Sequence, residues 1–129
     1  AVAEHLVSLG RKRIVHIAGP YDNADARERA QAFAEALQEH PGILLETVQG
    51  DFSEQSGETC TEALLSGGRT FDALFAANDN MALGALQSLR RAGRSGGGSV
   101  RRAAGSGKRR AGCAVLWFEP AHRFARRGA

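Results

Sequence analysis

The sequence of 129 residues has little of what marks a metal centre, a disulfide framework or a membrane protein. Its two cysteines, Cys60 and Cys113, have no partners at metal-binding spacing and provide no disulfide framework. No apolar run approaches the ~18 residues that a membrane span requires. The basic residues near the N-terminus follow the first apolar run, which is the reverse of an export signal. We therefore predict no metal, no cofactor and no membrane partner, and the absence of Met at position 1 suggests a piece of a longer chain.

The motifs of several enzyme classes are missing as well. No Ser or Cys lies beside a candidate base, and no glycine-rich phosphate loop occurs. Asp22 and Asp25 could suggest a glycosidase, but nothing in the sequence places a second carboxylate opposite them. The sequence thus predicts a binding protein rather than an enzyme, with no catalytic residue.

Acidic residues are nearly absent from the last part of the chain. Residues 94–129 hold nine Lys and Arg but one acid, Glu119, whereas residues 1–93 carry a net charge of −5. This asymmetry predicts two regions, a folded domain over 1–93 and a basic Gly/Arg-rich tail over 94–129.

Helical and strand patterns alternate along residues 1–93. The spacing of apolar residues predicts helices over 2–9, 26–39, about 53–66 and 79–92, and short apolar runs predict strands over 13–18, 43–48 and 71–77. His16, within the first strand, is expected to be a satisfied core residue, and Asp25 and Asp79 are expected to cap helices. The order indicates an α/β fold, an open parallel sheet with helices on both faces. Such sheets bind ligands beyond the carboxyl ends of their strands.

Three loops at those ends carry polar or aromatic side chains. The first contains Arg27 and Arg29, which lie about 200° apart around a helix, so that one of them can enter the crevice and the other would stay in solvent. Asn78 ends the third strand and, if Asp79 caps the helix, is free to bind a polyol. Phe52 follows the second strand, where its ring either stacks on a ligand or packs in the core.

These segments resemble a known family. The runs HLVSLGRKRIVHIAGP, DARERAQAF, QGDFSEQSG and LFAANDNMALGALQSLRRAG are similar to the LacI/GalR family of bacterial transcriptional regulators. The resemblance covers residues 1–93 and the C-terminal subdomain of that family's effector-binding core, a periplasmic-binding-protein-like module. The run AANDNMALGALQSL is its most specific part.

The resemblance implies which side chains bind an effector. It assigns ligand binding to Arg29, Asn78, Phe52 and Asn23, and so favours Arg29 over Arg27. It further implies a sugar or nucleoside-like effector, a cytoplasmic homodimer, and operator DNA bound through a domain that this sequence does not contain. A periplasmic-type sugar-binding protein shares the fold and stays an alternative.

The resemblance stops at Gly93, and the tail has two interpretations. One is a basic segment that binds nucleic acid by neutralising phosphates, in which Cys113–Phe118 forms a single strand. The other is a frameshift product of a GC-rich gene. In that case the fourth core strand is lost, the edge formed by residues 71–77 is unpaired, and the chain is expected to aggregate.

Overall fold

A computed structural model describes residues 2–93, 100–101, 113–119 and 123–127 of the chain. Helices and strands alternate through the first part, as the sequence predicts. The elements are α1 (Val2–Ser8), β1 (Arg13–Ala18), α2 (Ala24–Gln38), β2 (Leu44–Gln49), α3 (Glu54–Ser66), β3 (Ala73–Ala76), α4 (Asp79–Arg91), β4 (Val100–Arg101), β5 (Cys113–Glu119) and β6 (Arg123–Arg127).

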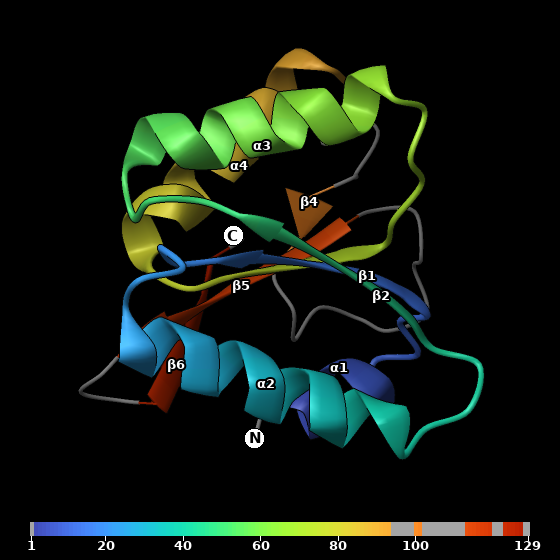
Figure 1. Cartoon of the computed structure of the whole chain (residues 1–129). Coiled ribbons are helices and arrows are strands. Elements are labelled where there is room, and N and C mark those ends of the chain that lie inside the picture. The colour runs from blue at the N-terminus through green and yellow to red at the C-terminus, as the bar shows by residue number, and fades with distance from the viewer. Residues whose placement is uncertain (1, 94–99, 102–112, 120–122, 128–129) are drawn as a thin grey trace.

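One open sheet runs through the molecule in the order β2-β1-β3-β5-β4, with β6 also paired to β5 (Figure 1). Strands β2, β1, β3 and β5 are mutually parallel. Beyond β5, β4 pairs with Cys113 and Ala114, and β6 continues antiparallel along Val115–Glu119. The predicted fold class, an open parallel sheet covered by helices, is confirmed.

The predicted loss of the fourth core strand is wrong. Residues 73–76 of β3 pair in parallel with residues 114–117 of β5, so β3 is an interior strand and not an unpaired edge. The apolar run Cys113–Phe118 is a strand, as expected, and its buried residues fill the space beside β3. The division at residue 93 and the origin of the tail stay predictions, because most of residues 94–112 lie outside the described part.

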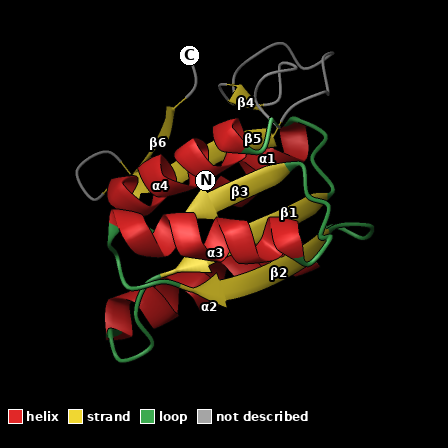
Figure 2. Cartoon of the chain, turned by 90° about the horizontal axis from the view of Figure 1, so that it is seen from above, coloured by secondary structure: helices red, strands yellow, loops and turns green. Residues whose placement is uncertain are grey.

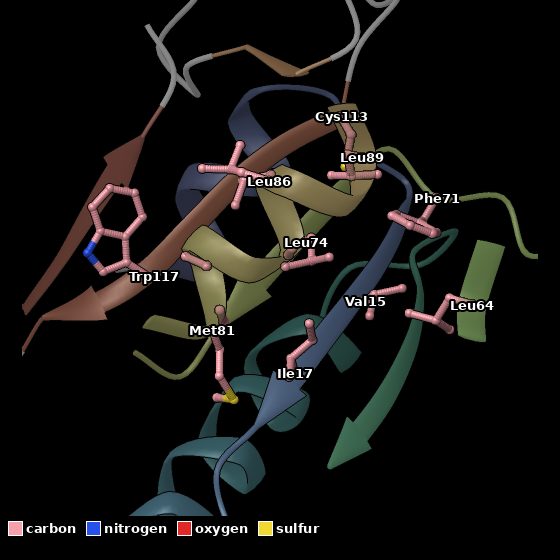
Figure 3. Packing of buried hydrophobic residues seen from close by; sticks show 14 of the residues in the cluster. Val15, Ile17, Leu64, Phe71, Leu74, Met81, Leu86, Leu89, Cys113 and Trp117 are labelled. Atoms are coloured by element: carbon pink, nitrogen blue, oxygen red, sulfur yellow. The ribbon is translucent and has the colours of Figure 1, made fainter. Parts of the chain in front are cut away.

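Helices cover both faces of the sheet, α3 and α4 one face and α1 and α2 the other (Figures 1 and 2). Side chains along each strand alternate between the two cores, as the period of a strand requires. In β1, Ile14 packs with α1 and α2, whereas Val15 and Ile17 pack with α3 and α4. Figure 3 shows the α3/α4 core, in which Met81 and Leu86 of α4 lie over the sheet and Trp117 of β5 extends the same core. Interior strands buried on both faces explain the nearly continuous apolar runs of β1, β3 and β5.

Candidate functional site

The loops after β1, β2 and β3 meet at the carboxyl edge of the sheet. Phe52, from the loop after β2, lays its ring against Gly19, from the loop after β1. A Cβ at Gly19 would lie 2.5 Å from the Phe52 Cε1 atom, so a larger residue here would displace the Phe52 ring. Asn78, at the end of β3, donates a hydrogen bond from its amide Nδ2 to the Phe52 carbonyl oxygen at 2.8 Å. The structure therefore brings two of the four predicted ligand residues into contact.

Phe52 has a backbone conformation that side chains rarely adopt. Its φ of 77° makes it the only non-glycine residue with positive φ in the described part of the chain. Such strain persists where the surroundings fix the conformation, and it concentrates at ligand sites. Next to it, Ser53 donates from its amide and its hydroxyl to the Asp51 carboxylate, at 2.9 and 2.5 Å. Hydrogen bonds from Ser53 hold the pKa of the Asp51 carboxyl below its usual value.

Asn78, and not Asp79, caps α4. Its Oδ1 accepts from the Met81 amide at 3.0 Å, while its Nδ2 binds Phe52. The expectation that Asp79 caps the helix and leaves Asn78 free is therefore wrong. Asp79 cannot replace it, because only Asn78 carries both an acceptor for the helix and a donor for Phe52. Asn78 can therefore offer a ligand the second hydrogen of its Nδ2 group and the second lone pair of its Oδ1 atom.

Two substitutions at Asn78 should separate these two contacts. Asn78→Asp keeps the helix-capping oxygen but loses the donor to Phe52, so we expect a loss of about 1 kcal/mol in the free energy of unfolding. Asn78→Ala loses both contacts, and we expect about 2 kcal/mol. Chemical denaturation of both variants measures the difference. Equal losses would mean that the bond to Phe52 contributes nothing.

Asn23 has a similar role at α2. It is the N-cap, and its Oδ1 accepts from the Ala26 amide at 2.8 Å, so the prediction that Asp25 caps this helix is wrong. Asp25 instead lies in the first turn, where its carboxylate pairs with Arg29 at 2.5 Å. The capping oxygen of Asn23 is used by the helix, which leaves its Nδ2 as the group that could meet a ligand.

The two arginines of α2 have different surroundings. Arg27 donates to the Tyr21 carbonyl oxygen at 2.5 Å and lies 5.5 Å from the centre of the Tyr21 ring, on the side of β2. Arg29 is 27% exposed and borders a 200 Å³ slot whose walls include Phe33 and Phe75. Arg27 also borders a hollow, one lined by Gly19 and Tyr21, so the expectation that only one arginine enters the crevice stays a prediction. Which of them binds a ligand stays a prediction.

Of the four predicted ligand residues, the structure joins Asn78 and Phe52 directly. Amides, a guanidinium and an aromatic ring are the groups commonly found in sites for small polar ligands, so the assignment of all four to one site stays a prediction. Within the described ranges no three His, Cys, Asp or Glu side chains are grouped to hold a metal ion. No described helix has the length and hydropathy to cross a bilayer. The contact between Gly19 and Phe52 was not predicted; a glycine directly after a strand, which often marks a close approach, was the signal that could have indicated it.

Comparison with known proteins agrees with this arrangement. A family model described as "Periplasmic binding protein domain" matches residues 1–107. The chain is 40% identical over 95 residues to the HTH-type transcriptional regulator CelR of Thermobifida fusca, and 36% identical over 90 residues to the lactose operon repressor of Escherichia coli. It is also 35% identical over 80 residues to the ribose import binding protein RbsB of Haemophilus influenzae. These alignments cover 70%, 70% and 62% of the chain, but only 27%, 25% and 27% of the relatives. None of these relatives is named as an enzyme, which supports the prediction of a binding domain.

Solved structures give the same picture. A dimeric Lac repressor with a C-terminal deletion superposes with a TM-score of 0.68 at 35% identity, covering 71% of this chain and 34% of that one. The Escherichia coli transcriptional repressor ascG superposes with a TM-score of 0.71 at 28% identity, covering 92% of this chain and 39% of that one. The longer match includes residues beyond 93. The chain thus spans roughly a quarter to two fifths of these proteins, and the resemblance to the effector-binding core of LacI-type regulators is confirmed.

Proposed function

The chain belongs to the periplasmic binding protein domain family, and from this premise we propose that it is one lobe of the effector-binding core of a LacI-type transcriptional regulator. The effector is a small sugar or nucleoside-like molecule, held at the carboxyl edge of the sheet by Arg29, Asn78, Phe52 and Asn23. In the intact regulator, binding would favour one arrangement of two lobes and so change the affinity of a separate DNA-binding domain for its operator. The intact regulator is proposed to act in the cytoplasm as a homodimer.

One observation carries this proposal. The turn at Phe52, with its positive φ, meets the ends of β1 and β3: its ring lies against Gly19, and its carbonyl oxygen accepts from the Asn78 amide. Its ring is partly buried against the core, so the face that stays open can stack on the apolar side of a sugar or base. The carboxyl edge of an open parallel sheet is where such folds bind ligands. The lobe forms only part of a cleft, so its own affinity should be weak.

Substitution of the two arginines tests the assignment of Arg29. We expect that titration calorimetry with a panel of sugars and nucleosides identifies a ligand of the parent chain. Its affinity should fall at least tenfold in Arg29→Lys, because an ammonium group cannot replace a bidentate guanidinium contact. Arg27→Lys is the matched control on the same helix and should change the affinity less than twofold. Equal losses in both variants, or a loss only in Arg27→Lys, would contradict the assignment.

A second candidate is a sugar-binding protein of an import system. It is favoured by the similarity to RbsB and by an ABC-transporter solute-binding protein with bound D-allose, which superposes with a TM-score of 0.66 at 25% identity. Both candidates use the same lobe, so the difference lies in what precedes it in the gene. A helix-turn-helix segment upstream supports the regulator, and an export signal upstream supports the import protein.

Nucleic-acid binding by the basic tail stays a separate proposal. Much of residues 94–129 lies outside the described residues. A tail that acts this way gives DNA binding that weakens steeply with salt and is lost when residues 94–129 are removed. Binding that survives the removal would exclude it.

A further inference from the structure

Three helices begin at the carboxyl edge of the sheet, where the ligand site is proposed. α2, α3 and α4 follow the parallel strands β1, β2 and β3 in turn, and Figure 1 shows their first turns on the same side of the sheet. The first turn of a helix carries a partial positive charge and unpaired amides, and it therefore attracts anions. This edge would favour a ligand with a phosphate or a carboxylate group if the chain placed no negative charge of its own there.

Each of these first turns contains an acidic side chain. The three residues are Asp25 in α2, Glu54 in α3 and Asp79 in α4. Asp51 adds another carboxylate directly before α3, where it accepts hydrogen bonds from the N-cap Ser53. The positive ends of the three helices thus have carboxylates of the chain itself beside them, and these oppose the approach of a negatively charged ligand.

Asp25 is also the partner of the predicted ligand-binding arginine. Its Oδ2 atom lies 2.5 Å from the Nη2 atom of Arg29, one helical turn further along α2. Residues four apart share a helix face, with Cβ atoms about 6 Å apart, so the carboxylate stays near the guanidinium even when the ion pair opens. The side chain of Asp25 is 65% exposed and that of Arg29 is 27% exposed. A ligand that approaches Arg29 from solvent therefore passes close to Asp25.

The other charged residues at this edge do not reverse the balance. Arg27 donates to the Tyr21 carbonyl oxygen, and Asp22 lies in the same loop. Strands β5 and β6 contribute one residue of each sign, Glu119 and Arg123, which are partners in the register of the two strands. Where the structure describes side chains, carboxylates thus outnumber guanidinium groups at the carboxyl edge.

We propose that Asp25 restricts this site to ligands without a negative charge, because its carboxylate neutralises Arg29 and repels a phosphate or carboxylate group that would otherwise bind there. The inference rests on the proposed function, since it takes Arg29 to be a ligand-binding residue. It narrows the effector to a neutral sugar or nucleoside and excludes sugar phosphates and nucleotides.

The same ion pair suits hydroxyl groups. A hydroxyl both donates and accepts, so neighbouring hydroxyls of a sugar can donate to the Asp25 carboxylate and accept from the Arg29 guanidinium. A phosphate dianion can only accept, and beside Asp25 its charge is opposed at short range. Asp25 is therefore a specificity-determining residue: it favours a polyol at the position where it disfavours an anion.

Inorganic phosphate tests the inference without knowledge of the effector. Thermal unfolding of the full chain is followed as phosphate is added at neutral pH and constant ionic strength. Asp25→Asn removes the charge of an exposed side chain that does not cap the helix, and it should bind phosphate about tenfold or more tightly than the parent. Asp22→Asn removes the same charge from the same loop, Asp25→Glu keeps the charge, and both should behave as the parent does. Equal phosphate binding by Asp25→Asn and the parent, or an equal gain in Asp22→Asn, would overturn the proposal.

Paired ligands separate this inference from the proposed function. Titration calorimetry compares ribose with its phosphate ester, and adenosine with adenosine monophosphate, in the parent and in Asp25→Asn. The parent should bind the neutral member of a pair about tenfold or more tightly than the charged member, and this preference should fall by about tenfold in Asp25→Asn. A parent that prefers the charged member would overturn the inference and leave the proposed function standing. If the parent binds neither pair, the result counts against the proposed function, and the phosphate titration decides the inference alone.

Discussion

Gly84→Ala is expected to destabilise the chain, although alanine is the better helix former. Gly84 lies in the middle of α4, where alanine alone would add about 1 kcal/mol. A Cβ at this position would lie 2.0 Å from the Glu54 carbonyl oxygen and 2.8 Å from the Glu58 amide nitrogen of α3. Both are backbone atoms that cannot rotate away, so the helices must separate. We expect a net loss of about 2 to 3 kcal/mol in the free energy of unfolding.

The contact involves glycines from both helices. A Cβ at Gly57 of α3 would lie 2.2 Å from the Met81 carbonyl oxygen of α4. Further along, Ser88 donates to the Glu58 carbonyl oxygen at 3.2 Å, and Arg91 pairs with Glu58 and with Glu62. The contact at Met81 lies in the first turn of α4, directly after the Asn78 cap that bonds Phe52. We therefore expect Gly84→Ala to reduce effector affinity as well as stability.

The control for this prediction is a glycine at which an added Cβ would contact no other atom. Gly10 has a φ of 78°, and a Cβ there would meet nothing within 4 Å. Gly10→Ala should cost about 1 kcal/mol through its backbone conformation alone. Urea denaturation of both variants gives the comparison. If Gly84→Ala is as stable as the parent or more stable, α3 and α4 do not touch through their backbones.

Local patterns predicted the elements of residues 2–93 well because each reports a local property. Apolar spacing locates α2 and α4, and apolar runs between turns locate β1 and β3 to within two residues at each end. The pairing of strands joins residues far apart in the sequence, and the prediction that β3 has no neighbour on one side was wrong. The frameshift interpretation of residues 94–129 implied that β3 had lost its neighbour, but β5 pairs with it in parallel.

The caps show a second limit of sequence reasoning. Asn78 and Asp79 are adjacent, and both side chains can accept from a helix amide. What selects Asn78 is its second bond, to the carbonyl oxygen of Phe52, a residue 26 positions earlier. At α2, Asn23 and Asp25 compete in the same way, and the pairing of Asp25 with Arg29 removes it from capping. The left-handed backbone of Phe52 has no sequence signal, since a glycine is the residue normally expected there.

His16 should make stability depend on pH between about 4 and 6.5. Its ring is 1% exposed in β1, stacks on Phe75 with centroids 4.8 Å apart, and its Nδ1 lies 2.8 Å from the Phe75 carbonyl oxygen. A carbonyl can only accept, so Nδ1 carries the proton of the neutral ring. Burial opposes a charge here and lowers the pKa of His16 to about 4, although the bond to Phe75 favours protonation.

The lowered pKa fixes the direction of the effect. Above pH 6.5 the histidine is neutral in both the folded and the unfolded chain and contributes no pH dependence. As the pH falls below 6.5 the unfolded chain takes up a proton that the folded chain refuses, so stability falls until the folded chain is protonated near pH 4. Across that window the loss should reach about 3 kcal/mol, which for a small domain is a large part of its total stability.

His16→Phe and His16→Gln distinguish this effect from the titration of carboxylates. Both variants remove the titrating ring, while glutamine keeps a donor for the Phe75 carbonyl oxygen and phenylalanine keeps the aromatic packing with Phe33 and Phe75. The free energy of unfolding of each variant is measured by urea denaturation between pH 4 and pH 7.5. Below pH 6.5 it should fall less steeply than that of the parent, by about 1.4 kcal/mol per pH unit. In all three proteins, protonation of carboxylates would still lower the stability near pH 4. If both variants lose stability with acid as steeply as the parent, His16 takes up its proton in the folded chain, and the core around Phe75 must open to water at mildly acidic pH.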